Sequence, residues 1–309
     1  MSFLCVSVDL DEIDCYHAIH GISELPDPQV AHVVYERALP RISRFFEELE
    51  IKGTLFAVGR DLSRAESGEM IRAMFRKGNE IGNHTQSHAY DFSLLSVDRQ
   101  NWEIESAATE IRRVTGTPPK GFRAPGYNLN LGIVSMLARN GYEYDSSVFP
   151  CPAYFAAKAA AIGIKQVLGR TSKSILGDPR VLGAPIVPYR IGEDGIWTRG
   201  KEGLKELPIC VVTKARLPFI GTSAAAAGVL GARLLAKSAA SLPVVNFELH
   251  GMDFLDADGD GISYLKAHQT DIRIPLSKRL ASLESAVKTL LDKGLEPLPL
   301  FEAANRTFI

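Results

Sequence analysis

The 309-residue sequence lacks an excess of charge of either sign. Lys and Arg number 35 against 36 Asp and Glu, and the basic residues form no continuous stripe. Proteins that bind nucleic acid by neutralising phosphates need such an excess or stripe. The composition therefore predicts no nucleic-acid partner. Apolar residues make up 46% of the chain, enough for a substantial core, and we expect a single domain over residues 1–309.

Cysteine is scarce, and the few cysteines are scattered. Cys5, Cys15, Cys151 and Cys210 contain no C-x-x-C pair. This spacing predicts reduced thiols rather than disulfides or zinc ligands. The first residues also lack the basic leader and the apolar segment of a secretion signal. Together these features lead us to expect a cytoplasmic protein.

A long uninterrupted apolar run is missing as well. The best candidate, residues 224–247, is interrupted by Arg233, Lys237 and Pro243. Membrane-spanning helices need about 20 apolar residues with few or no charges. We therefore predict no transmembrane segment, but a helix over about 222–240 followed by a buried strand over 244–249. The basic residues of that helix are compatible with peripheral contact with a membrane.

The rest of the chain alternates strand and helix patterns. Apolar, β-branched runs predict strands over 3–8, 52–58, 80–83, 121–123, 142–145 and 295–301. Helical spacing predicts helices over 29–50, 67–77, 96–114, 131–140 and 277–293, with Trp102 on the buried side of the third. This order favours a parallel sheet, open or closed into a barrel. Residues 150–221 break the rhythm, and we expect them to be an irregular insertion that lines or covers the site.

Polar side chains stand at the predicted strand ends. Asp9 and Asp11 follow the first strand, and His84, Arg123 and Asp145 follow later ones. In parallel α/β folds, active-site residues gather at this edge.

The histidine pair His84 and His88 predicts a metal site at that edge. We expect the pair to lie on one helical turn and to grip a divalent cation from one side. Asp9 or Asp11 would be the third ligand, and the other acid would take a proton from a metal-bound water.

Five short motifs resemble those of the NodB-type polysaccharide deacetylases, carbohydrate esterase family 4. They are Ser7-Val8-Asp9-Leu10-Asp11, His84-Thr85-Gln86-Ser87-His88, Arg123-Ala124-Pro125-Gly126-Tyr127, Asp145-Ser146-Ser147 and Leu249-His250. The resemblance covers most of the chain. It implies a distorted (β/α) barrel of about seven parallel strands with an insertion at about 150–221.

The resemblance also implies a role for each residue. Asp9 would be the general base, held ionised and oriented by Arg123, and His250 the general acid, its pKa raised by Asp145. The metal ligands would be Asp11, His84 and His88. A backbone N–H at Gly126 or Tyr127 would stabilise the oxyanion. The His-His-Asp set favours one zinc ion, although such sites also accept cobalt, manganese or nickel.

Two departures from the family pattern leave alternatives open. The first motif is acid-x-acid, where many members have adjacent acids, so Asp9 and Asp11 could exchange roles. Gly126 stands where an aromatic residue usually follows the proline.

The resemblance implies hydrolysis of an N-acyl amide, first of all N-acetyl, on a sugar such as a nucleotide-linked or lipid-linked precursor of the cell envelope. The alternatives are a deformylase of a lipid-linked aminosugar, a hydrolase of small cyclic amides, and an inactive carbohydrate-binding scaffold.

Overall fold

A curled sheet forms the centre of the computed structural model, which describes residues 2–167 and 173–308. Among these residues, seven parallel strands follow one another in the order β11-β1-β2-β3-β4-β5-β8. They are β11 (Val244–His250), β1 (Phe3–Asp9), β2 (Thr54–Ala57), β3 (Glu80–Asn83), β4 (Gly121–Phe122), β5 (Tyr144–Asp145) and β8 (Lys205–Glu206). The short β12 (Glu296–Pro297) also pairs with β1.

An antiparallel hairpin extends the sheet beyond β8. It consists of β6 (Tyr189–Gly192) and β7 (Gly195–Gly200), with β6 paired to β8. A separate pair is formed by β9 (Val211–Val212) and β10 (Leu217–Pro218). The expected insertion therefore supplies the antiparallel strands of the sheet, and it also supplies β8, the last of the parallel strands.

Individual hydrogen bonds, rather than a strand ladder, join the chain after β8 to β11. The Cys210 N–H donates to the Asn246 carbonyl at 3.1 Å. The Asn246 side-chain amide donates to Ser146 Oγ at 2.9 Å and to the Leu207 carbonyl at 3.1 Å. These contacts curl the sheet into a half-barrel. The predicted fold class, a distorted (β/α) barrel with about seven parallel strands, is confirmed.

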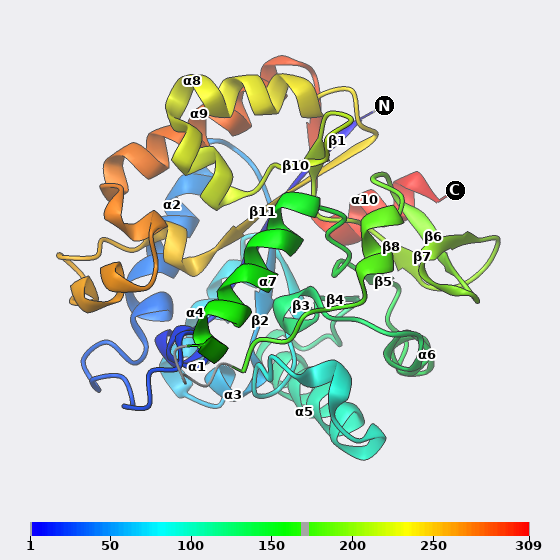
Figure 1. Cartoon of the computed structure of the whole chain (residues 1–309), viewed down its shortest axis with the longest axis horizontal. Coiled ribbons are helices and arrows are strands. Elements are labelled where there is room, and N and C mark those ends of the chain that lie inside the picture. The colour runs from blue at the N-terminus through cyan, green and yellow to red at the C-terminus, as the bar shows by residue number, and fades with distance from the viewer. Residues whose placement is uncertain (1, 168–172, 309) are drawn as a thin grey trace.

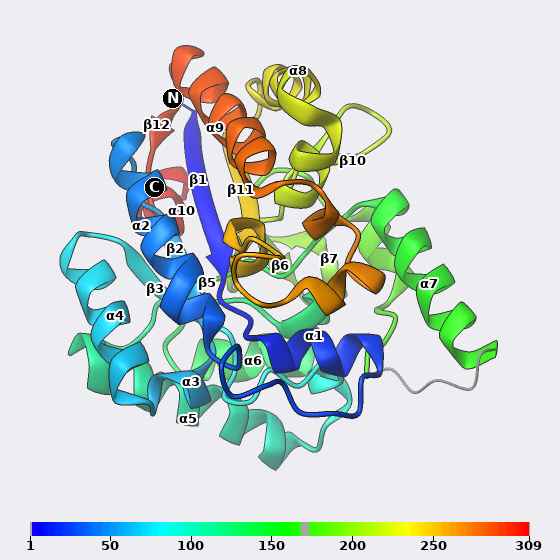
Figure 2. The same cartoon turned by 90° about the vertical axis from the view of Figure 1, so that its left-hand side faces the viewer.

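Helices flank the sheet (Figures 1 and 2). They are α1 (Ile13–His20), α2 (Leu39–Glu48), α3 (Gly59–Leu62), α4 (Ala65–Arg76), α5 (Val97–Thr115), α6 (Leu131–Arg139), α7 (Pro152–Val167), α8 (Gly221–Ala239), α9 (Leu276–Asp292) and α10 (Leu300–Thr307). Short turns of helix complete the set: η1 (Val34–Ala38), η2 (Phe92–Leu94), η3 (Pro125–Tyr127), η4 (Pro179–Gly183), η5 (Gly251–Phe254), η6 (Ser263–Ala267) and η7 (Asp271–Arg273).

Helical apolar spacing places the core beneath these helices. In α2, Leu39, Ile42, Phe45 and Phe46 recur at that spacing and are all buried. Pro40 is the second residue of α2 and closely follows the π-helical turn η1, which ends at Ala38. A main cluster of apolar side chains from β1, β11, α2 and α9 fills the space between the sheet and these helices.

Three local expectations are wrong. Residues 300–307 form α10 rather than continuing a last strand, and residues 152–167 form α7 within the expected irregular region. In α5, Trp102 is 43% exposed, and its neighbour Glu103 is buried instead because Ser87 donates to it. No helix in the described ranges is long and apolar enough to cross a membrane.

Candidate active site

Parallel register gathers the expected polar residues at one edge of the sheet. Asp9 at the end of β1 is the register partner of His250 at the end of β11. Arg123 follows Phe122, which pairs with Asn83 on one side and Asp145 on the other. The arrowhead of β1 marks this edge, which faces α1 (Figure 2).

Asp11 lies between the two histidines of the second motif. Its Oδ1 is 3.3 Å from Nε2 of His84 and 3.2 Å from Nε2 of His88. This oxygen is buried and accepts no hydrogen bond from the described residues. Burial alone would raise the pKa of Asp11, but His88 and His84 hold that pKa well below its usual range. An ionised, buried oxygen facing two imidazole nitrogens has the chemistry of a cation site.

The backbone carbonyl of Arg123 fixes the tautomer of His84. The Nδ1–H of His84 donates to this oxygen at 2.7 Å, so in the neutral ring the lone pair is on Nε2, which faces Asp11. Metal-binding histidines are commonly held in this way by a second hydrogen bond. The residues present therefore fit a divalent metal ion, with Asp11, His84 and His88 as its protein ligands.

The two histidines lie in a loop, not on a helical turn as expected. Thr85 and His88 have left-handed backbone conformations, with φ of 66° and 55°. The Thr85 N–H donates to Asn83 Oδ1 at 2.7 Å, and the His88 N–H donates to Thr85 Oγ1 at 3.1 Å. These bonds stabilise the tight bend that turns both rings toward Asp11.

A second cluster of acid and imidazole groups adjoins the first. Asp9, Glu248 and His250 also offer ligand atoms close to one another. Here, however, the groups already have partners. Arg123 Nη1 donates to Asp9 Oδ1 at 2.6 Å, and His250 Nδ1 lies 2.8 Å from Glu248 Oε1. The Asp11 cluster is thus the better candidate for a metal ion.

Arg123 is fully buried and all its donor nitrogens are engaged. Besides Asp9, it donates to Ser7 Oγ at 2.9 Å, to Ser146 Oγ at 2.8 Å and to the Ser146 carbonyl at 2.8 Å. This network holds the guanidinium rigidly beside Asp9. The positive charge of Arg123 therefore lies in direct contact with the Asp9 carboxylate.

The acid next to His250 is Glu248, not Asp145 as expected. Burial would lower the pKa of His250, but Glu248 raises it well above its usual value. Asp145 instead accepts hydrogen bonds from the N–H and Oγ of Ser147, both at 2.8 Å. Sequence reasoning missed Glu248, although its spacing of two residues from His250 on one strand puts both side chains on the same face.

Asp145 belongs to a supporting network with Glu206 of β8. Burial, followed by the negative charge of Asp145, raises the pKa of Glu206 well above its usual value. Burial raises the pKa of Asp145 as well, while Glu206 lowers it. Ser147 Oγ in turn accepts from the Ala124 N–H at 2.8 Å. The network fixes the chain that leads from Arg123 into η3.

Gly126 and Tyr127 differ in what their N–H groups do. The Tyr127 N–H donates to the Ala124 carbonyl at 3.0 Å and is thereby occupied. No hydrogen bond from the Gly126 N–H is found within residues 2–167 and 173–308. Gly126 has φ of 60°, a conformation that favours glycine. Lys158 of α7 donates to the Gly126 carbonyl at 2.9 Å, a contact that was not foreseen.

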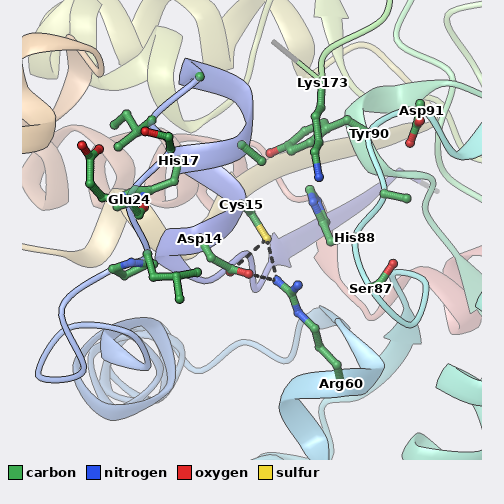
Figure 3. A pocket seen from close by; sticks show the side chains of 17 residues that line it. Asp14, Cys15, His17, Glu24, Arg60, Ser87, His88, Tyr90, Asp91 and Lys173 are labelled. Atoms are coloured by element: carbon green, nitrogen blue, oxygen red, sulfur yellow. Dashed lines mark hydrogen bonds and ion pairs between the residues drawn. The ribbon is translucent and has the colours of Figure 1, made fainter. Parts of the chain in front are cut away.

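Two cavities meet at this site. One, of about 290 Å³, is lined by the catalytic candidates Asp9, Asp11, His84 and His250 and by side chains of α7. The other, of about 610 Å³, lies beside His88 (Figure 3). It is lined by an ion pair between Arg60 and Asp14, whose closest atoms are 2.6 Å apart. Tyr90 lines both cavities, whereas His84 lines the smaller one and His88 the larger one.

Comparison with known proteins agrees with the motifs. Residues 32–144 match the family model of polysaccharide deacetylase. A peptidoglycan deacetylase from Helicobacter pylori is 23% identical over 143 residues, which are 46% of this chain and 47% of the relative. The chain therefore matches less than half the length of this curated relative.

Solved structures share the fold over nearly the whole chain. A candidate polysaccharide deacetylase from Mycobacterium smegmatis is 18% identical with a TM-score of 0.61, covering 99% of this chain and 89% of that one. A carbohydrate esterase family 4 pseudoenzyme from Bacillus anthracis is 11% identical with a TM-score of 0.52, covering 98% and 65%. Residues 32–144 thus resemble the polysaccharide deacetylase family in sequence, and the chain as a whole shares the fold of these solved structures.

Proposed function

We propose that the protein is a metal-dependent hydrolase that removes an N-acyl group, first of all acetyl, from a sugar. The observation that carries the proposal is the convergence of three units at one cavity. They are the cluster of Asp11 with His84 and His88, the buried Asp9–Arg123 pair, and the Glu248–His250 pair. Together they offer a metal site, a base and an acid.

The donor set supports zinc as the metal. Two imidazole nitrogens and one carboxylate oxygen are a ligand set of catalytic zinc, and they leave an open position. Cobalt, manganese and nickel also suit such ligands. When bound, the ion would polarise the acyl carbonyl and acidify a water molecule.

The geometry supports Asp9 as the base and Asp11 as the ligand. Asp11 Oδ1 faces both imidazoles, whereas Asp9 Oδ2 is 3.8 Å from His84 alone and Asp9 Oδ1 is held by Arg123. Asp9 would take a proton from the attacking water while the water oxygen forms a bond to the acyl carbon. The Gly126 N–H, which is the unoccupied one, would face the carbonyl oxygen as charge develops there.

His250 would complete the reaction as general acid. The C–N bond breaks only if the amine leaves protonated, and an imidazolium held by Glu248 can give that proton. Its Nε2 lies 3.9 Å from Asp11 Oδ2, at the same cavity as the proposed ligands. The products are the free amine of the sugar and a carboxylic acid.

The cavity's own residues favour an enzyme over the rival scaffold. The fold alone is shared with a pseudoenzyme and so does not decide between them. Here the proposed base, acid, ligands and Arg123 are all present and mutually oriented.

The acyl group and the sugar carrier are open to direct test. Release of acetate or of formate would separate deacetylation from the alternative of deformylation, and opening of a cyclic amide would release neither.

The surface of α8 supports a lipid-linked substrate. Leu230 is 74% and Leu234 67% exposed, and the neighbouring Arg233 and Lys237 are exposed as well, so this face is suited to peripheral membrane contact. The four cysteines are free and buried, in keeping with a cytoplasmic precursor.

The test of the proposal is acid release from N-acetylated chito-oligosaccharides and formylated aminosugars by the zinc-loaded protein. Chelation should abolish release, and zinc should restore it. A protein that binds zinc but releases no acid from any acyl sugar would favour the scaffold.

A further inference from the structure

Helix α7 presents a continuous stripe of side chains to the catalytic cavity. The stripe consists of Tyr154, Ala157, Lys158, Ala161 and Lys165, all of which line the cavity with Asp9 and His84. Their spacing of three, four and seven residues puts them on one face of the helix. The two alanines leave room beside the helix, and the two lysines extend from it. The side of α7 that faces the cavity therefore has room beside the alanines and positive charge at the lysines.

Both lysines reach across to backbone oxygens of other elements. Lys158 Nζ donates to the Gly126 carbonyl of η3 at 2.9 Å, and Lys165 Nζ donates to the Ile19 carbonyl of α1. An ammonium has three N–H donors, so each lysine keeps two for another partner. Lys158 Nζ is also 3.5 Å from where a Cβ on Gly126 would lie. A Cβ at this position would be in ordinary van der Waals contact with the ammonium.

Neither ammonium has a counter-charge in the described part of the chain. Both lysines are partly buried, yet no carboxylate within 4.0 Å pairs with either of them. Burial lowers the pKa of Lys158 to about 8 and also lowers that of Lys165, and no acid offsets the effect. The remaining acids of the cavity wall, Asp253 and Asp271, come from η5 and η7 rather than from α7. A buried charge without a partner is costly, so a bound anion would be stabilised here.

We propose that Lys158 and Lys165 form a binding site for an acidic group, a carboxylate or a phosphate, carried by the acylated sugar. The inference rests on the proposed function, because it describes the substrate of the same cavity. The lysines are about 10 Å apart along the helix axis, since seven residues separate them. Lys158 would meet an acidic group near the acyl carbon, and Lys165 one farther along the sugar chain.

Matched ligand pairs test this site. N-acetylglucosamine is compared with its 1-phosphate, and di-N-acetylchitobiose with the disaccharide of N-acetylglucosamine and N-acetylmuramic acid, which carries a carboxylate. Affinities are measured by calorimetry on the zinc-loaded, full-length protein. We expect the acidic member of at least one pair to bind roughly tenfold more tightly or better, as a charge-assisted contact requires. The pair that shows the preference identifies the acid as phosphate or carboxylate.

The variant K158Q/K165Q tests whether the positive charge is required, because glutamine keeps a hydrogen-bond donor and loses the charge. It should lose the preference for acidic ligands, whereas the control K278Q/K293Q, which removes two exposed charges elsewhere, should keep it. In the wild type, salt should weaken only the acidic ligands. Equal affinity within both pairs in the wild type, or a preference that survives in K158Q/K165Q, would overturn the inference. Failure of the proposed function would look different: acidic ligands would bind, but no acid would be released.

Discussion

Glu248 Oε1 lies 2.8 Å from Nδ1 of His250, two residues away on the same strand. The pair stands where the end of β11 meets the cavity, and the Glu248 carboxylate favours the protonated form of the His250 imidazole. Tyr127 also donates to this carboxylate through its hydroxyl at 3.2 Å, so Glu248 is held from two sides. The acid group proposed for catalysis therefore depends on a residue that none of the five motifs contains.

Replacement of Glu248 by Gln should impair turnover more than metal binding. Without the carboxylate, His250 loses the charge that keeps it protonated, and we expect kcat to fall by roughly a hundredfold or more. Zinc content, measured by atomic absorption, should stay at the wild-type level because Glu248 is outside the proposed ligand set. The matched variant D145N should reduce kcat less, since Asp145 does not contact His250. Equal losses in both variants would contradict the pairing.

The two acids of the first motif should separate in a metal-binding experiment. D11N, H84A and H88A should each lose zinc and activity together, because each removes a proposed ligand. D9N should keep zinc and lose turnover, because it removes the proposed base. If D9N lost the metal and D11N retained it, the two roles would be exchanged.

A side chain at Gly126 should be unfavourable. Its φ of 60° makes any L-residue strained, at a cost of about 1–2 kcal/mol, and a Cβ would lie 3.3 Å from Tyr90 Cδ1 and 3.5 Å from Lys158 Nζ. We expect G126A to lower the unfolding free energy by about that amount and to reduce kcat by displacing the free N–H. G116A, at an exposed helix end with φ of 82° and open space around it, is the control for strain alone. A kcat for G126A no lower than that for G116A would count against Gly126 as the oxyanion donor.

Glu206 should make the protein less stable as pH rises. Its pKa in the folded protein is well above the ordinary value of 4.5, so the folded state keeps a proton that the unfolded state releases. The free energy of unfolding should therefore decrease as pH rises above that ordinary value, by up to about 1.4 kcal/mol per pH unit for one group. Because Gln does not titrate, E206Q should flatten this dependence.

Urea unfolding at several values between about pH 5 and pH 8 measures the slope. The exposed Glu193 provides the control variant E193Q, which should follow the wild type. A wild-type slope that E206Q leaves unchanged would show that Glu206 is not the proton-binding group.

The sheet and the grouping of polar residues were predictable because both follow from strand ends. Asp9, His84 and Arg123 each stand just where a recognisable apolar strand stops, and parallel strands bring such ends together. The roles assigned to these residues stay predictions. The partner of His250 was missed because none of the five motifs contains Glu248, although the alternation of side chains along a strand puts Glu248 and His250 on one face.

Helix α7 escaped prediction for a different reason. Its alanines carry little apolar contrast between faces, and Pro152 and Gly163 resemble loop residues. The stripe from Tyr154 through Lys158 to Lys165 was nevertheless present at helical spacing. Helical spacing of apolar residues placed Trp102 on the buried side of α5, but the neighbouring Glu103 is buried instead, because it has a specific hydrogen-bond donor in Ser87.

The most direct test of the central claim is acid release by the wild type and by D9N, both loaded with zinc to one ion per chain. The substrates are N-acetylated and N-formylated aminosugars, assayed for acetate and formate with and without chelator. The account predicts metal-dependent release by the wild type and none above background by D9N at equal zinc content. Release that persists after complete removal of the metal, or equal release by D9N, would contradict it.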